Sequence, residues 1–297
     1  MASDWKGQTR GGLFGYRFFI WLIRSAGVRT AYAFLYLVVP YFVLFAPKAV
    51  RSIWSYSRRS LRLGRAASVL MVFRNFHALG RTLIDKMAIN GGMSGKYTFR
   101  FENYDEFLRI LDSGAGVIMI GAHIGNWEIG APFFSKYGDR LNIVMYDNEH
   151  RRIKELLEAN AISHDYKIIP VNEDSLAHIF SITAALQAGE YVCFQGDRYT
   201  PEEKTLCGSL LGRKALFPMG PFLLASRMRV PVVFYFAMRE PGMKYRFHFF
   251  PSGISEGRMT KEAVLDRYAS VLEEMLGRYP EQWFNYYDFW KNDTETK

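Results

Sequence analysis

The residues best suited to chemistry are His123 and Glu128, which stand five positions apart behind an apolar run. The run 116–121 predicts a buried strand, so we expect His123 at the strand end or in the turn, and Glu128 in the first turn of a helix. Residues five apart on one helix point about 140° apart, so the two side chains can meet only across such a turn. The Glu128 carboxylate could then orient the imidazole, with His123 as a general base.

Plainer explanations of this pair compete with the catalytic one. A histidine in a turn is usually a hydrogen-bonding residue, and a glutamate in a first helical turn is favoured by the helix dipole. No metal site and no cofactor are expected, because the spacing is not His-Glu-x-x-His and no second His or Cys lies near His123.

The cysteine content indicates a reducing compartment. The chain has two cysteines, Cys193 and Cys207, and neither belongs to a Cys-x-x-Cys pair. We interpret Cys193 as a buried strand residue and Cys207 as a loop residue.

The elements around His123 predict an α/β fold, a mixed sheet covered by helices on both faces. After Gly91-Gly92, short apolar segments alternate with amphipathic ones. Strands are expected at 97–101, 117–120, 143–146, 167–171, 191–195, 232–238 and 245–250. Helices are expected at 104–111, 127–136, 151–162, 176–187, 221–227 and 261–278.

The N-terminal part predicts a hydrophobic helical membrane anchor. The stretch 30–46 has no charge, but its 17 residues include Pro40, and a spanning helix needs about 20. A helical pair embedded in one leaflet therefore fits as well as a true span, and a buried pair in a soluble core is the alternative. The predicted organisation is a flexible tail (1–12), the anchor (13–48), a basic helical region (49–90), the α/β catalytic domain (91–290) and a second tail (291–297).

The charge distribution favours an anionic lipid surface as a partner. Residues 1–100 hold 16 of the 38 Lys and Arg but only two of the 29 Asp and Glu, which gives +14 there and −5 in the remainder. Nucleic acid is the rival partner for a basic segment. It is not expected, because the cations flank apolar runs and form no recognisable nucleic-acid-binding motif.

Four segments, in order, resemble the bacterial lipid A late acyltransferases, a family of glycerolipid-type acyltransferases with a His-x4-Asp/Glu motif. The first, residues 121–128, reads Gly-Ala-His-Ile-Gly-Asn-Trp-Glu. The others read Phe-Gln-Gly-Asp-Arg (194–198), Gly-Arg-Lys-Ala-Leu-Phe-Pro-Met-Gly (212–220) and Pro-Glu-Gln-Trp (280–283). The resemblance covers nearly the whole chain. The chain departs from it at Asp197-Arg198-Tyr199, where the family often has Asp-x-Asp, and its Arg151 and Arg152 are unaligned candidates for a family arginine.

The resemblance implies an enzyme that moves a fatty acyl chain from an acyl-carrier-protein thioester to a hydroxyl of a lipid A precursor. It implies His123 and Glu128 as catalytic residues and backbone N–H groups after His123 as oxyanion donors. It also implies a bacterial inner-membrane protein with its catalytic domain on the cytoplasmic side. The substrate-binding residues it implies are Asn126, Gly196, Asp197, Arg198, Arg213 and Lys214. Trp283 we interpret as a packing residue.

Three other functions remain open at this stage. The same chemistry could serve another acceptor, such as an amino-acid lipid, a glycolipid or a polyene lipid. A hydrolase would release the acyl chain to water, but no Gly-x-Ser-x-Gly elbow is present. A non-catalytic membrane-binding protein would explain the basic, apolar N-terminus and leave His123 and Glu128 as coincidence.

Overall fold

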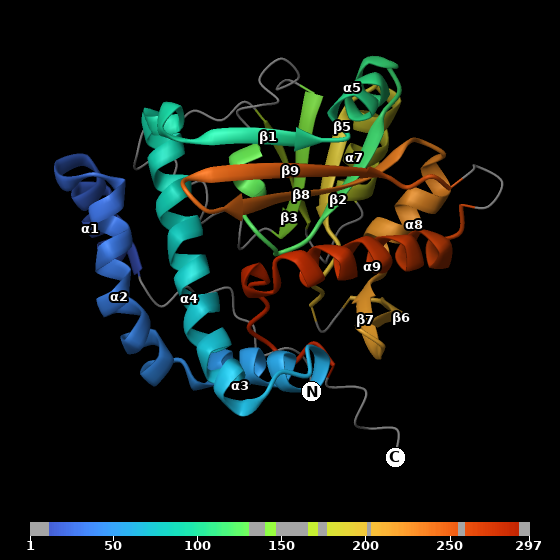
Figure 1. The fold of residues 1–297 in the computed structure, drawn as a ribbon. Coiled ribbons are helices and arrows are strands. Elements are labelled where there is room, and N and C mark those ends of the chain that lie inside the picture. The colour runs from blue at the N-terminus through green and yellow to red at the C-terminus, as the bar shows by residue number, and fades with distance from the viewer. Residues whose placement is uncertain are drawn as a thin grey trace.

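A seven-stranded mixed sheet forms the centre of the molecule (Figure 1). The computed structural model describes residues 12–130, 140–146, 166–171, 177–200, 203–254 and 259–290. Every neighbouring pair of strands is parallel except β8 and β9. The strand order across the sheet is β1 (Thr98–Glu102), β9 (Lys244–Pro251), β8 (Val232–Glu240), β2 (Val117–Gly121), β5 (Tyr191–Gln195), β3 (Leu141–Tyr146) and β4 (Lys167–Val171).

Helices cover both faces of this sheet, which confirms the predicted fold class. Side chains alternate between the faces along each strand, so Val117 and Met119 belong to one apolar cluster while Ile118 and Ile120 belong to the other. The first face packs against the N-terminal helices and α5 (Tyr104–Asp112). The second packs against α7 (Ala177–Gln187), α8 (Met219–Met228) and α9 (Lys261–Arg278).

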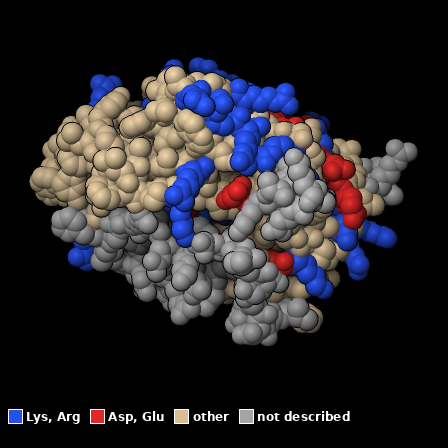
Figure 2. Space-filling model, turned by 90° about the horizontal axis from the view of Figure 1, so that it is seen from below, with Lys and Arg blue, Asp and Glu red and all other residues tan. Residues whose placement is uncertain are grey.

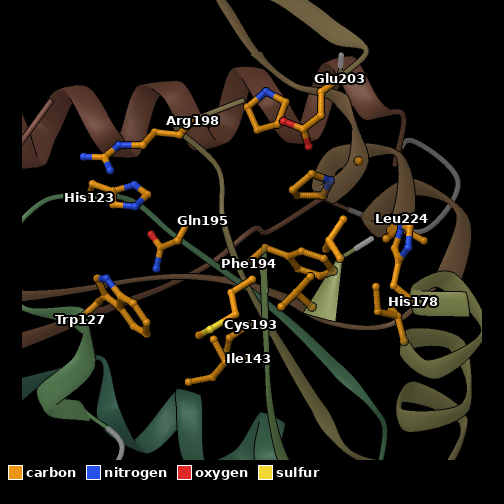
Figure 3. A pocket seen from close by; sticks show the side chains of 17 residues that line it. His123, Trp127, Ile143, His178, Cys193, Phe194, Gln195, Arg198, Glu203 and Leu224 are labelled. Atoms are coloured by element: carbon orange, nitrogen blue, oxygen red, sulfur yellow. The ribbon is translucent and has the colours of Figure 1, made fainter. Parts of the chain in front are cut away.

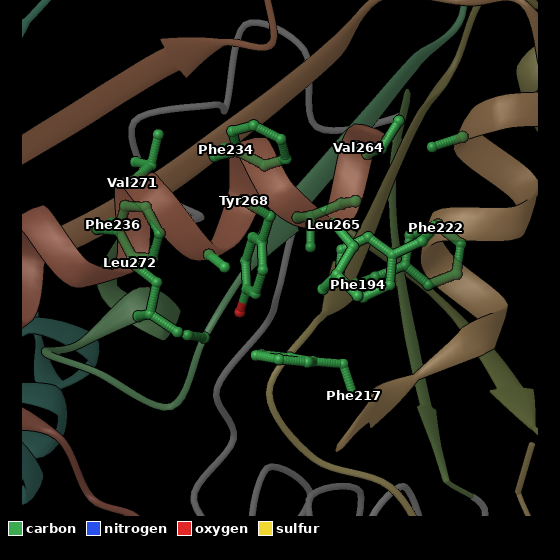
Figure 4. Packing of buried hydrophobic residues seen from close by; sticks show 14 of the residues in the cluster. Phe194, Phe217, Phe222, Phe234, Phe236, Val264, Leu265, Tyr268, Val271 and Leu272 are labelled. Carbon is green, nitrogen blue, oxygen red and sulfur yellow. The ribbon is translucent and has the colours of Figure 1, made fainter. Parts of the chain in front are cut away.

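Aromatic side chains fill the contact between α9 and the second face (Figure 4). Tyr268 of α9 is fully buried, and its ring lies 5.6 Å from that of Phe234 on β8. Its hydroxyl donates a hydrogen bond of 2.9 Å to the carbonyl of Gly121 at the end of β2. α9 thereby supports the strand end from which His123 follows.

The N-terminal helices pack on the first face rather than standing apart. They are α1 (Gly12–Ala26), α2 (Val28–Phe45), α3 (Pro47–Ser55) and α4 (Arg65–Ala88). α1 folds back along α2, and the rings of Phe18 and Phe34 lie 5.1 Å apart where the two helices meet. Within the described residues, α2 is the one helix long and apolar enough to cross a membrane, judged by length and composition alone.

A buried charged network joins α2 and α4 to the sheet. The Asp85 carboxylate of α4 is fully buried and accepts hydrogen bonds from the hydroxyls of Tyr32 on α2, Tyr97 and Tyr245. Its Oδ2 also lies 2.7 Å from Nε of Arg239 at the end of β8. Since an unpaired buried charge is strongly unfavourable, these partners hold the N-terminal helices and the central sheet together.

Most sequence-predicted elements are confirmed to within a few residues, and β4, β5 and α9 have the predicted bounds. A two-stranded hairpin, β6 (Thr205–Leu210) and β7 (Arg213–Pro218), was not predicted, and Cys207 lies in β6 rather than in a loop. Its turn, Leu211-Gly212, has positive φ at both residues, as in type I′ hairpins, but lacks the usual Asn-Gly signal. The predicted helix 151–162, with Arg151 and Arg152, and most of 127–136 lie outside the described residues.

Candidate active site

The ends of two neighbouring strands bring His123 and Asp197 together. Strands β2 and β5 are parallel, and Gly121 is in register with Gln195. His123 and Asp197 each follow their strand by two positions, so both stand at the carboxyl edge of the sheet, where α/β proteins commonly place their chemistry.

The Asp197 carboxylate is the hydrogen-bond partner of the His123 imidazole. The His123 Nδ1 lies 2.7 Å from Asp197 Oδ1, and the His123 backbone N–H donates to Oδ2 at 2.9 Å. The Trp283 indole N–H also donates to Oδ2, at 3.3 Å, and the Tyr287 hydroxyl donates to the Asp197 carbonyl at 2.8 Å. Asp197 is fully buried, whereas 18% of the His123 side chain is exposed, so only the imidazole can meet a substrate.

This arrangement leaves Nε2 of His123 as the basic atom. Burial acts to raise the pKa of Asp197, but the charge and hydrogen bonds of His123 and the charge of Arg198 outweigh it and hold that pKa below its usual value. An ionised carboxylate only accepts hydrogen bonds, so Nδ1 carries the proton and Nε2 keeps its lone pair.

Glu128 does not contact His123, although the sequence predicted that the two side chains meet. Its carboxylate pairs with the ammonium of Lys86 on α4, and among the described contacts none joins it to His123. Residues 127–130 form a single 3-10 turn, which carries Glu128 to the face of the sheet covered by α4. The structure therefore assigns the imidazole-orienting contact to Asp197, while a catalytic role of Glu128 remains a prediction.

Gly125 and Gly196 allow the two site loops to approach their neighbours. Gly125 has φ +65, and a Cβ there would collide with the carbonyl of Ala237 on β8. A Cβ on Gly196 would lie 2.8 Å from Cγ2 of Ile120 and 2.9 Å from Cζ of Tyr268. The close contacts of Gly196 are thus with the core, and binding of substrate by Gly196 remains a prediction.

Asn126 is held in the scaffold of the site. Its side chain is buried, and its amide donates to the carbonyl of Thr82 at 3.1 Å and to the Tyr245 hydroxyl at 3.3 Å. Since Tyr245 in turn bonds to Asp85, Asn126 joins the catalytic loop to the buried charged network. These contacts favour a positioning role for Asn126.

The remaining predicted cations divide into one beside His123 and two on the hairpin. The Arg198 guanidinium donates to the Phe284 carbonyl at 2.7 Å, and Figure 3 shows it above the His123 imidazole. Arg213 packs over the Trp290 ring, 4.8 Å from its centroid, and Lys214 is exposed on the same strand, β7. Neither hairpin cation belongs to the described lining of the cavity at His123.

Two of the backbone groups proposed as oxyanion donors are already used. The Gly125 N–H donates to the Gln282 carbonyl at 3.0 Å, and the Asn126 N–H donates to the Ala237 carbonyl at 2.7 Å. An oxyanion at this site would therefore need other donors, and Arg198 is the one Lys or Arg in the described lining of the cavity.

An apolar cavity of about 140 Å³ extends from His123 into the fold (Figure 3). His123 and Arg198 stand at one end, and Ile143, Cys193 and Leu224 are among the apolar residues that line the interior. Burial raises the pKa of the Cys193 thiol to about 12, so it acts as an apolar wall rather than a nucleophile. His178 and Glu203 also line the cavity, on the side away from His123 in Figure 3, and the apolar surface between suits a ligand with a hydrocarbon tail.

The C-terminal segment supplies site residues that the sequence argument missed. Trp283 was interpreted as a packing residue; it does pack, but its N–H also bonds to Asp197. The side-chain amide of Gln282 forms hydrogen bonds of 2.8 and 2.9 Å with the backbone of Arg239. The Pro-Glu-Gln-Trp signature pointed to this segment, but not to these contacts.

The protein is an α/β protein in which a buried carboxylate orients an imidazole beside an apolar cavity, and this cavity suits a molecule with an apolar tail. A model of the family described as "Bacterial lipid A biosynthesis acyltransferase" matches residues 69–292. The chain belongs to this family, and it is therefore an acyltransferase. No match was found among curated proteins.

Proposed function

We propose that the protein moves a fatty acyl chain from an acyl-carrier-protein thioester to a hydroxyl group of a lipid A precursor. His123 is the general base and Asp197 orients it. The enzyme works at the bacterial inner membrane with its catalytic domain on the cytoplasmic side. The observation that carries the proposal is the 2.7 Å contact between His123 Nδ1 and the buried Asp197 carboxylate, at the mouth of an apolar cavity.

The chemistry of the proposed step follows from this contact. The acceptor hydroxyl gives its proton to His123 Nε2, and its oxygen forms a bond to the thioester carbonyl carbon. The tetrahedral intermediate collapses by breaking the carbon–sulfur bond. The imidazolium returns the proton to the leaving sulfur, which yields an ester and a free carrier thiol. Asp197 stabilises the imidazolium between the two proton transfers.

The positive charges near the cavity support the proposed carrier-protein donor and the proposed anionic lipid acceptor. Arg198 beside His123 is positioned to stabilise an oxyanion or to bind a phosphate of the acceptor. Lys and Arg side chains gather across the middle of the face seen in Figure 2, which suits an acidic carrier protein. Arg213 and Lys214 of the hairpin are proposed to contact the anionic headgroup outside the cavity.

Glu128 is proposed as the second carboxylate of the site. Its side chain is 27% exposed, so an acceptor can reach it, and the ion pair with Lys86 holds it in place. In this proposal Glu128 contacts the acceptor rather than the imidazole.

The test uses purified full-length protein in detergent, acyl-carrier-protein thioesters of several chain lengths and a lipid A precursor, with product mass as readout. A mass gain of one acyl chain that disappears in His123→Ala is the expected result. Thioester hydrolysis that needs His123 but gives no acylated precursor would contradict the acceptor and direct the search to another lipid. Transfer that survives His123→Ala with less than about tenfold loss would contradict the general base, because such a group contributes about 10²–10⁴-fold.

A further inference from the structure

Within the described residues, the outer surface of the N-terminal helices exposes several large apolar side chains. On α2 the exposed large side chains are Tyr36, Leu37, Tyr41, Leu44 and Phe45, between 57% and 74% exposed. A second stripe of the same helix, including Ala31 and Leu35, is buried against the protein. α2 is thus apolar on both sides, and Leu37 and Leu44 on its outer side are 71% and 74% exposed.

The exposed apolar surface continues from α2 onto α4. Val69, Leu70 and Phe73 of α4 are 38–49% exposed. Phe73 stands on the same helical face as His77 and Gly80, because residues three, four and seven apart share a face. α2 packs on that face, so the exposed residues of both helices point outward on the same side. We call these eight side chains of α2 and α4 the apolar face.

The packing of α2 on α4 argues against a spanning α2. The two helices run antiparallel, with Tyr32 bonded to Asp85, Leu35 against Gly80, and the Tyr36 ring 4.9 Å from His77. A spanning α2 would therefore carry the middle of α4 into the hydrocarbon with it. That stretch holds Arg74 and Arg81, and charged groups at the bilayer centre cost at least about 2.5 kcal/mol each.

The charges around the apolar face fit an orientation parallel to the membrane. Arg24 and Arg29 lie at one end of α2, and Lys48 and Arg51 lie at the other. Residues 12–84 contain no Asp or Glu. In a helix that lies flat, both cationic ends meet the anionic headgroups, whereas a spanning helix would send one of them across the bilayer.

The exposed tyrosines support the same orientation. Tyr36 stands near the middle of α2 and is 71% exposed, so in a spanning helix its hydroxyl would face hydrocarbon. In a helix lying at the interface it meets the headgroups, where tyrosine is preferred. Figure 2 shows a broad area without acidic or basic residues on the flank where Figure 1 places α1 and α2, with Lys and Arg at its margin.

We infer that the apolar face of α2 and α4 inserts into one leaflet of an anionic bilayer and that α2 does not cross it. α2 and α4 then lie together in the interface, about 5–10 Å deep, with the catalytic domain on a single side. This inference concerns how the protein sits on the membrane and does not depend on the acyl-transfer reaction.

The first experiment measures depth. Full-length protein with the exposed Cys207 changed to Ser is reconstituted into vesicles of phosphatidylethanolamine and phosphatidylglycerol. Spin labels are placed through Leu37→Cys on α2 and Leu70→Cys on α4, and the parent with only buried Cys193 is the control. Equal, shallow depths are expected for both labels. A Leu37 label at the bilayer centre with a Leu70 label in water would overturn the inference.

The second experiment measures sidedness in the same sealed vesicles. Ser25→Cys and Lys48→Cys mark the two ends of α2 and are treated with a membrane-impermeant maleimide. Both cysteines are expected to react from one and the same side of the membrane. Reaction of the two cysteines from opposite sides would overturn the inference. An inactive protein that still gives same-side labelling would contradict only the proposed reaction.

The third experiment tests whether α4 takes part. Leu70→Glu is expected to reduce partitioning of the full-length chain into the same vesicles by at least about tenfold. It replaces a leucine side chain that would be buried in the bilayer with a charged one. Ala184→Glu, at an exposed position of α7, is the matched control and should partition like the parent. Unchanged partitioning of Leu70→Glu would overturn the part of the inference that concerns α4.

Discussion

The His123 imidazole and the Asp197 carboxylate lie 2.7 Å apart although 74 positions separate them in the chain. Parallel pairing of β2 with β5 produces this contact, since both residues stand two positions beyond paired strand ends. Asp197 is fully buried, and its remaining oxygen is occupied by the His123 backbone N–H and the Trp283 indole. The orientation of the imidazole is therefore set by a carboxylate that does not itself reach substrate.

Asp197→Asn should lower kcat by about 10²–10⁴-fold, because an amide can hold the imidazole in the wrong tautomer and no longer stabilises its charged form. Steady-state kinetics with an acyl-carrier-protein thioester measure the effect. Glu128→Gln is the matched variant, and it should leave the acid limb of the pH–rate profile in place. If Glu128→Gln abolishes that limb and Asp197→Asn does not, Asp197 is not the orienting group.

Trp283→Phe should lower kcat with little change in KM, because it removes the indole donor to Asp197 while it keeps most of the ring packing. A loss of roughly 1 kcal/mol is expected from one such hydrogen bond, which corresponds to about a fivefold effect. Kinetics and thermal unfolding are measured together. A change in unfolding temperature with unaltered kcat would show that Trp283 is only a packing residue.

Gly125→Ala should reduce both stability and activity, because φ is +65 and a Cβ would collide with the Ala237 carbonyl. We expect a loss of at least about 1 kcal/mol in the free energy of unfolding. Gly277→Ala is the matched control. Gly277 lies in α9 with nothing within 4 Å of an added Cβ, so that change should be neutral or stabilising by about 0.4–1 kcal/mol. Equal effects of the two substitutions would contradict this account.

The preferred acyl chain should respond to the width of the cavity. Ile143 and Leu224 both line it, so Ile143→Phe is expected to favour shorter chains and Leu224→Ala longer ones. Competition between thioesters of different length, with product mass as readout, gives the ratio directly. A shift in the same direction for both variants would indicate that this cavity does not hold the acyl chain.

Acid should destabilise the protein through His248. Burial lowers its pKa to about 4, and nearby Arg278 and Arg246 act in the same direction, although the charge of Glu102 opposes them. The folded pKa is thus below the unfolded value of about 6.5, so the unfolded state binds more protons between these values and stability falls as pH decreases. The loss approaches about 3 kcal/mol by pH 4. In denaturant unfolding at several pH values, His248→Gln should show a shallower decline between pH 6.5 and 4, and an unchanged slope would contradict the assignment.

The sequence predicted the elements better than their contacts. Sequence patterns are local, so the continuous apolar run of β5 and the helical periodicity of α9 placed these elements with their observed bounds. The sequence also identified His123 and Asp197 as residues that follow buried strands. It could not pair them, because strand order and register depend on contacts between distant segments.

Glu128 illustrates the limit of reasoning from spacing. The five-residue spacing between His123 and Glu128 suggested that their side chains meet across a turn. In the structure, the turn at Gly125 and the 3-10 residues after it direct the Glu128 carboxylate to Lys86 instead. The hairpin of β6 and β7 was missed for a related reason, since its turn uses Leu211 in a conformation that leucine seldom adopts.

The buried Asp85 network has a practical consequence for anyone who wishes to prepare a soluble fragment. Truncation before residue 46 would remove Tyr32 and Leu35. It would uncover Gly80 of α4, against which Leu35 packs, and expose to water the Asp85 carboxylate that Arg239 and Tyr245 contact. Tyr245 also bonds to Asn126, three residues from His123, so the damage would reach the catalytic loop. The N-terminal helices are therefore part of the structure that supports the candidate active site, and a fragment without them should lose both stability and activity.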